Sequence, residues 1–114
     1  MNLKVDEQGH ILLVKILEPR LDAAISLDFK NKMSEYIKNG HKSILINLSE
    51  VDFIDSSGLG AMVTSLKLLG EKGGISICGV RETVKSMFKL TRMNFVFNIF
   101  ENENEALAEL SKNN

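Results

Sequence analysis

The sequence predicts an α/β domain in which short apolar strands alternate with amphipathic helices. Apolar runs rich in Ile, Leu and Val recur along the chain, as in strands that are covered on both faces. Between these runs, apolar residues recur at helical spacing and mark one buried face. Because helices separate most strands, those strands are expected to run parallel to one another. The 114 residues suffice for one such domain, spanning residues 1–114, and are too few for two.

The beginning of the chain predicts an antiparallel hairpin at the edge of the sheet. Residues 3–5 alternate in polarity, Gln8-Gly9-His10 is typical of a turn, and residues 11–17 are strongly apolar. Pro19 then ends regular pairing at its own nitrogen. The later strands are expected at residues 44–48, 75–80 and 96–100, and the helices at residues 23–39, 56–72, 81–90 and 104–111.

The stretch at residues 43–74 organises the chain. An apolar strand is followed by a polar turn, a short apolar segment at residues 51–54 and then Asp55-Ser56-Ser57-Gly58-Leu59-Gly60. From Leu59 onward the apolar residues adopt helical spacing, with Met62 on the same stripe. Lys72-Gly73-Gly74 is expected to end this helix, with a glycine in the left-handed cap.

The start of this helix has an unusual composition. Gly58 and Gly60 fall in or near the first turn, where each costs up to ~1 kcal/mol relative to alanine. Asp55, Ser56 and Ser57 are all good N-caps, although one cap is enough for one helix. Two interpretations follow. These residues form a binding site that something approaches closely, or Ser56 or Asp55 caps the helix and the glycines only ease a sharp turn.

The composition argues against several classes of partner. The formal net charge is −1 and the 14 Lys and Arg residues are scattered, so neither a nucleic acid nor an acidic membrane is expected as a partner. The single cysteine, Cys78, lies in an apolar run and is expected to be a buried structural thiol. No apolar stretch is long enough to span a bilayer, and the first residues lack the core of a signal peptide, so the cytoplasm is the expected compartment.

The sequence carries no recognisable catalytic constellation. His10 and His41 both fall in loops beside glycine, and no Cys/His spacing is typical of a metal site. Ser57 has no histidine placed to activate it, and Gly58-Leu59-Gly60 lacks the remainder of a dinucleotide or phosphate-binding loop. We therefore expect a protein that is not an enzyme and that needs neither a cofactor nor a metal.

Residues 48–60, LSEVDFIDSSGLG, resemble the signature of bacterial anti-sigma factor antagonists, which are single STAS domains. Leu21-Asp22 resembles the family's Leu-Asp pair, and the segments 89–93, 96–100 and 103–107 resemble its C-terminal part. The resemblance implies a STAS-type mixed sheet with an N-terminal antiparallel hairpin, followed by alternating helices and parallel strands. It also implies a regulator of transcription that works by partner switching and carries out no catalysis.

The resemblance implies a specific switch. The unphosphorylated protein would bind an anti-sigma factor that is also a serine-protein kinase of the histidine-kinase-like ATPase type. The kinase would release itself by phosphorylating Ser57, and a PP2C-type phosphatase would restore binding. The free protein is expected to be a monomer. The residues expected to contact the partner are Asp22, Asp55, Ser56, Ser57, Gly58, Leu59, Gly60 and Met62.

Several alternatives remain open at this stage. Ser56 is the rival phosphate acceptor, and its other expected role is the helix N-cap. Asp22 and Asp55 have turn or cap roles as alternatives to partner contact, and Leu59 and Met62 have core packing. The module could instead bind a nucleotide or anion at the Ser57 helix end, or act as a partner-switch scaffold with a non-transcriptional output. Pro19-Arg20 departs from the family's usual Gly-Glu-like pair and is expected to alter the loop beside Ser57.

Overall fold

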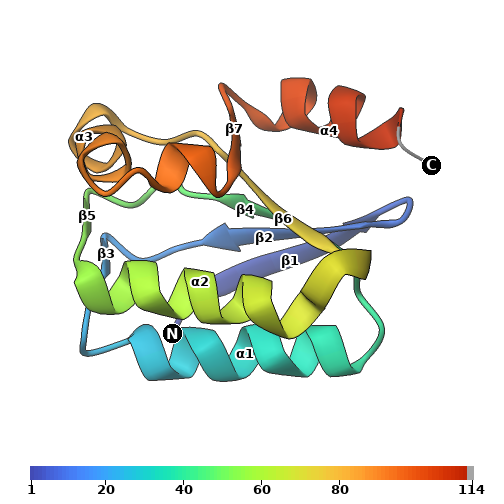
Figure 1. Ribbon diagram of the computed structural model, residues 1–114, viewed down its shortest axis with the longest axis horizontal. Helices are drawn as coiled ribbons and strands as arrows, with labels where there is room; N and C mark the ends of the chain where they lie inside the picture. Colours follow the sequence, from blue (N-terminus) through green and yellow to red (C-terminus); the bar gives the residue numbers. More distant parts are fainter. Residues whose placement is uncertain (113–114) are drawn as a thin grey trace.

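The computed structural model describes residues 1–112, and they form one α/β unit with strands and helices alternating after an initial hairpin (Figure 1). The strands are β1 (Leu3–Gln8), β2 (Ile11–Ile16), β3 (Arg20–Leu21), β4 (Ser43–Asn47), β5 (Phe53–Ile54), β6 (Gly74–Cys78) and β7 (Asn98–Phe100). The α-helices are α1 (Ser26–Lys38), α2 (Ser56–Leu69), α3 (Glu82–Leu90) and α4 (Glu103–Ser111), and the 3-10 turns are η1 (Gly70–Lys72) and η2 (Met93–Phe95).

Five strands form one mixed sheet in the order β1-β2-β4-β6-β7. β1 pairs antiparallel with β2, and every other pair in this sheet is parallel. The predicted antiparallel hairpin followed by parallel strands is therefore confirmed. Because the parallel strands share one direction, their carboxyl ends meet at one edge of the sheet, and the loops that follow β2 and β4 are brought together there.

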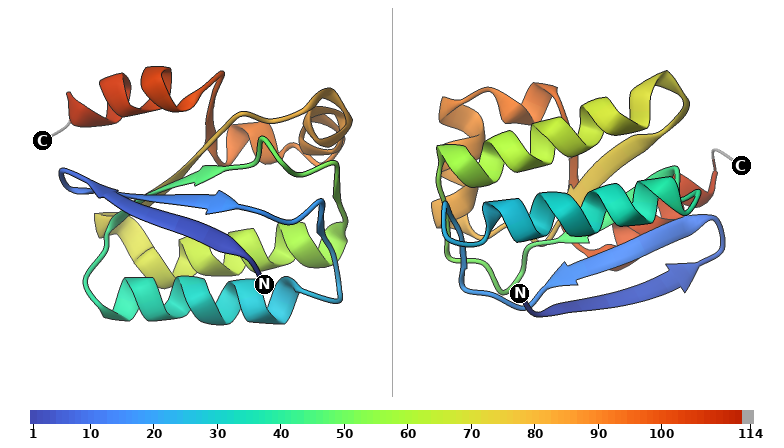
Figure 2. Two further views of the ribbon diagram at one scale, coloured as in Figure 1. Left: turned by 180° about the vertical axis from the view of Figure 1, so that it is seen from behind. Right: turned by 90° about the horizontal axis from the view of Figure 1, so that it is seen from below.

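Helices cover both faces of the sheet. α1 and α2 lie side by side on one face and α4 lies on the other (Figures 1 and 2). The larger apolar cluster joins the sheet to α1, α2 and α3 and contains the fully buried Phe29, Met62 and Phe88. A smaller cluster joins the opposite face to α4 through Cys78 and Ala106. Helix α2, which carries Ser57 in its first turn, is thus anchored in the main core.

The predicted buried thiol is confirmed, since Cys78 is fully buried in β6. Burial raises the pKa of this thiol from its ordinary value of 9.0 to about 12, with a smaller contribution from Glu103. The native thiol therefore stays protonated and unreactive where an exposed thiol would ionise.

We expect Cys78 to resist a thiol-labelling reagent at pH 8 in the folded protein and to react fully in denaturant. Because the folded pKa lies above the unfolded one, the unfolded state loses its proton first, and the free energy of unfolding decreases as the pH rises from about 9 toward 12. Labelling kinetics at pH 8 in increasing urea measure the first effect, and urea unfolding at several pH values above about 9 measures the second. Rapid labelling of the native protein without urea would contradict this account.

The secondary structure differs from the sequence-based expectations at several places, including β6 and β7, which end or begin two residues away from the expected positions. α2 ends at Leu69, and Gly70 takes the positive φ of 68°, so the expected cap at Gly73 or Gly74 is wrong. Gly73 is extended, and its close neighbour is the Lys42 carbonyl, which leaves no room for a side chain. α4 begins one residue earlier than expected because Asn102 caps it by accepting a hydrogen bond from the Glu105 amide. The short strand pair β3–β5 was not indicated by the sequence.

Candidate functional site

The strands β3 and β5 join the two loops at the carboxyl edge of the sheet. They pair in parallel, Arg20 with Phe53 and Leu21 with Ile54. Pro19, which cannot donate, accepts instead through its carbonyl oxygen, from the amides of Asp52 and Phe53. These bonds place the β3–α1 loop directly against the start of α2.

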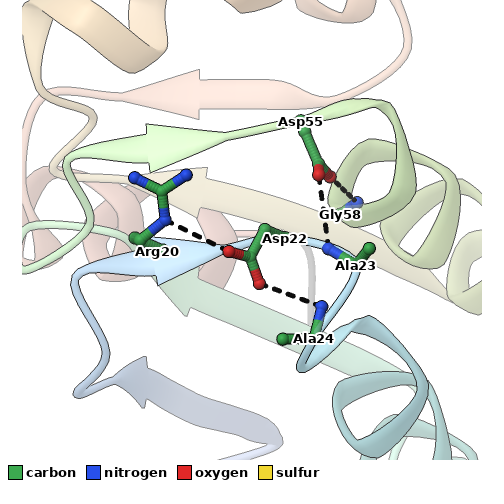
Figure 3. A network of polar contacts seen from close by, with 6 residues as sticks. All are labelled: Arg20, Asp22, Ala23, Ala24, Asp55 and Gly58. Carbon is green, nitrogen blue, oxygen red and sulfur yellow. Dashed lines mark hydrogen bonds and ion pairs between the residues drawn. The ribbon is translucent and has the colours of Figure 1, made fainter.

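Asp55 is the N-cap of α2, which decides between the two capping candidates (Figure 3). One of its carboxylate oxygens accepts a hydrogen bond from the Gly58 amide at 3.0 Å. The other accepts from the Ala23 amide at 3.2 Å, across 32 residues of sequence. The same side chain therefore starts the helix and ties it to the preceding loop, while Ser56 is left free of the capping role.

Asp22 lies in the loop that Asp55 holds. Its Oδ1 accepts from the Ala24 amide at 3.1 Å and closes a turn before α1 (Figure 3). Its Oδ2 accepts from Arg20 Nε at 3.1 Å, and the Arg20 guanidinium lies 4.1 Å from the centre of the Phe53 ring. The departure at Pro19-Arg20 thus adds a cation to the loop beside the site, paired with Asp22 and stacked on an aromatic ring.

The two glycines of the motif have different surroundings. A Cβ placed on Gly58 would lie 2.2 Å from the Leu21 carbonyl oxygen, so the close approach at Gly58 is made by β3 of the same chain. A Cβ placed on Gly60 would meet nothing within 4 Å, because this glycine is exposed. Gly58 is therefore required by the fold, whereas Gly60 leaves a bare strip of helix backbone facing outward.

Ser56 and Ser57 are both exposed in the first turn of α2. Ser57, but not Ser56, borders a shallow hollow of about 260 Å³ between α1 and α2. The hollow is lined by Ser26, Leu27, Lys30, Ser57, Gly60, Ala61 and Thr64. The contribution of α1 could not be predicted, because nothing in the sequence shows that the two helices lie side by side.

Two residues predicted to contact a partner are core residues. Met62 is fully buried and Leu59 is 6% exposed, and both belong to the main apolar cluster. In this structure the Met62 side chain offers no surface to a partner, and Leu59 offers almost none. Their apolar character is explained by packing, and the exposed apolar side chain beside Ser57 is Leu27, which is 62% exposed.

The positions of the two histidines do not form a catalytic site with Ser57. His10 and His41 lie at the amino ends of β2 and β4, whereas Ser57 lies beyond the carboxyl ends, so neither histidine can activate it. Within residues 1–112, no three His, Cys, Asp or Glu side chains are grouped to hold a metal ion. No helix in the same described part is both long enough and apolar enough to cross a bilayer.

Replacing Asp55 by alanine is expected to lower the free energy of unfolding by about 2 kcal/mol. The change removes an N-cap, typically worth about 1 kcal/mol, and a hydrogen bond of about 1 kcal/mol to Ala23. Urea unfolding measures the loss. Ser56→Ala is the matched control and should change stability by less than about 0.5 kcal/mol. Equal losses in the two variants would show that Ser56 shares the capping role.

Comparison with known proteins identifies the family to which this fold belongs. The sequence profile of the STAS domain matches residues 2–106, and the chain belongs to the STAS domain family. An anti-sigma F factor antagonist of Paenibacillus polymyxa is 32% identical over 114 residues, which cover 96% of this chain and 97% of the relative. An anti-sigma-B factor antagonist of Staphylococcus aureus is 26% identical, covering 89% and 94%. These names describe regulators and not enzymes.

Solved structures show the same fold. A crystal structure of an anti-sigma factor antagonist from Mycobacterium paratuberculosis superposes with a TM-score of 0.86 at 18% identity, covering 95% of this chain and 92% of that one. The anti-sigma factor antagonist SpoIIAA in its unphosphorylated form gives a TM-score of 0.73 at 18% identity, covering 97% and 98%. The Bacillus SpoIIAA structure in the phosphorylated form gives 0.72 at 19% identity, covering 96% and 99%.

Proposed function

We propose that this chain is an anti-sigma factor antagonist controlled by phosphorylation of Ser57. The unphosphorylated protein, a single cytoplasmic domain that is monomeric when free, binds an anti-sigma factor that is also a serine-protein kinase of the histidine-kinase-like ATPase type. Phosphorylation of Ser57 releases the partner, and a PP2C-type phosphatase restores binding. Support comes from the relatives named anti-sigma factor antagonists and from the exposed hydroxyl at the start of α2.

The observation that carries the proposal is the contrast between Asp55 and Ser57. Asp55 uses both carboxylate oxygens within the fold, so the capping role does not occupy the serines. Ser57 is exposed and borders the α1–α2 hollow together with the bare backbone at Gly60. A kinase can therefore reach this hydroxyl, and a bound partner can lie against it.

The partner surface that we propose combines both helices. Leu27 supplies an exposed apolar side chain, Thr64 and Lys30 supply polar ones, and Gly60 permits close approach of the partner's backbone. Asp22 and Asp55 border this surface and hold its loop in place. Apolar contact beside a small neutral hydroxyl gives an interface that a phosphate would disrupt by its bulk and its charge.

Phosphorylation should disrupt the interface without unfolding the domain. A phosphate adds about −1.5 to −2 charges near pH 7. At the first turn of a helix, that charge is favoured by the helix dipole and the free backbone amides. The phosphorylated and unphosphorylated SpoIIAA structures match this chain almost equally well, with TM-scores of 0.72 and 0.73, which supports retention of the fold.

The test is phosphorylation of the purified protein by the anti-sigma factor kinase that co-purifies with it from its native cells. With Mg-ATP, intact mass should show one added phosphate, and peptide mapping should place it on Ser57. Ser57→Ala should remain unmodified, whereas the matched variant Ser56→Ala should be modified as the wild type is. A PP2C-type phosphatase should remove the phosphate and restore the complex. Modification of Ser56, or none at all, would overturn the proposal.

A further inference from the structure

A second surface, separate from the hollow at Ser57, has an unusual concentration of exposed apolar side chains. Leu90 is 83% exposed, Phe95 is 82% exposed and Val96 is 44% exposed. They lie at the end of α3 and around η2, and we call them the α3–η2 patch. The other large exposed apolar side chains of the described chain are single residues spread over β1, α1, α2, β5 and the loop after β2. Clustered exposure of this kind is typical of an interaction surface.

Two basic residues lie in the same segment as the α3–η2 patch. Lys89 and Arg92 are exposed, and in residues 1–112 neither forms an ion pair. Their neighbours on the same segment differ, because Lys85 pairs with Glu82 and Arg81 pairs with Asp52. Lys89 and Arg92 therefore remain free to bind a negatively charged group.

A groove of about 350 Å³ adjoins the patch at Lys89 and at Asn94, the residue before Phe95. Its lining is partly apolar and includes Val80, Phe88 of α3, and Ile99 and Phe100 of the edge strand β7. Lys85 and Lys89 of α3 also line it, as do Glu101 after β7 and Glu105 of α4. The groove thus combines apolar side chains with basic ones from α3 and acidic ones from the β7–α4 segment.

We propose that the α3–η2 patch and this groove form a docking site for a segment of another protein that carries apolar side chains flanked by acidic ones. The apolar side chains contact the patch and enter the groove, and the acidic groups pair with Lys89 and Arg92. A concave groove favours a protein segment over a flat bilayer, which cannot fill it. The site shares no residue with the hollow at Ser57, which lies between α1 and α2 (Figures 1 and 2).

The charged residues of the groove also orient the bound segment. Its acidic side chains should face α3, because Glu101 and Glu105 of the β7–α4 segment would repel them. Charge reversal at Lys89 should therefore weaken binding, and removal of the charge at Glu101 should strengthen it. A purely apolar contact would respond to neither change.

The test uses a short synthetic amphipathic helix with leucine on one face and glutamate on the other, titrated into the full chain and followed by two-dimensional NMR. We expect backbone signals of α3, η2 and β7 to shift. Phe95→Ser, Leu90→Ser and Lys89→Glu should each weaken binding at least about tenfold, and Glu101→Gln should strengthen it. Leu68→Ser is the matched control, since Leu68 is 52% exposed on α2, and it should leave the affinity unchanged. Ser57→Asp should also leave it unchanged.

Other outcomes would overturn the proposal. Equal binding of a peptide with lysine in place of glutamate would remove the charge argument, and no binding at millimolar peptide would remove the site. Binding to anionic phosphatidylglycerol vesicles that is lost in Phe95→Ser, without peptide binding, would assign the patch to a membrane. A concentration-dependent dimer that Phe95→Ser abolishes would assign it to a second copy of this chain. Thermal unfolding of each variant confirms that these surface changes leave the fold intact.

Discussion

Replacing Ser57 by aspartate is expected to weaken binding of the anti-sigma factor at least about hundredfold while the domain stays folded. The substitution places a carboxylate where the proposed interface accommodates a neutral hydroxyl, beside two carboxylates that are already present at Asp22 and Asp55. Burying an uncompensated charge typically costs about 3 kcal/mol or more, and about 2.7 kcal/mol corresponds to a hundredfold loss of affinity. Isothermal calorimetry or surface plasmon resonance measures the change.

Two variants control for this result. Ser57→Ala keeps the site small and neutral and should retain binding within about tenfold, so that charge and bulk are separated from the loss of a hydroxyl. Ser56→Asp places the same charge one residue away, outside the α1–α2 hollow, and should weaken binding much less. Urea unfolding of Ser57→Asp should give a stability within about 1 kcal/mol of the wild type, because the helix start favours a negative charge. Unchanged binding in Ser57→Asp would contradict the proposed switch.

Gly58→Ala is expected to destabilise the domain by about 2 kcal/mol, as much as is expected for the loss of the Asp55 cap. The added Cβ would lie 2.2 Å from the Leu21 carbonyl oxygen and 3.0 Å from Ile54 Cγ1, so the helix start or β3 must move. Overpacking of this kind typically costs about 1–3 kcal/mol, which outweighs the gain of up to about 1 kcal/mol in helix propensity. Urea unfolding measures the difference.

Gly60→Ala is the matched variant and should have the opposite effect on stability. Its Cβ would meet nothing within 4 Å, so the domain should gain about 0.5–1 kcal/mol from helix propensity alone. If a partner's backbone lies against Gly60 as proposed, the same variant should bind that partner more weakly despite its greater stability. A destabilised Gly60→Ala would contradict the structural distinction between the two glycines.

Much of the fold follows from the sequence because long apolar runs and helical stripes are strong signals. The hairpin, the parallel strands and the four α-helices were predicted in the correct order. The strands β3 and β5 were missed because two residues are too few to show a period, and their pairing depends on a contact between distant parts of the chain. The end of α2 was misplaced because three glycines lie close together, and tertiary contacts select which of them takes a positive φ.

The candidate site was predicted less completely than the fold. The motif located the start of α2, and both capping candidates were recognised, yet the choice of Asp55 depends on the Ala23 amide being brought within 3.2 Å. Leu59 and Met62 fit both a core stripe and a contact surface in sequence, and only the packing of α2 against the sheet shows them to be core residues. Leu27 was not considered because its position beside Ser57 depends on how α1 and α2 pack.

The bridge from Asp55 to Ala23 has a consequence for how fast the proposed switch can act. The Asp55 carboxylate and the β3–β5 pair already hold the loop before α1 and the start of α2 in place. The free domain therefore presents the proposed partner surface at Ser57 without prior ordering. Association then proceeds as a nearly rigid encounter that loses little chain entropy. In the proposed switch, no refolding step therefore needs to precede capture or release of the partner.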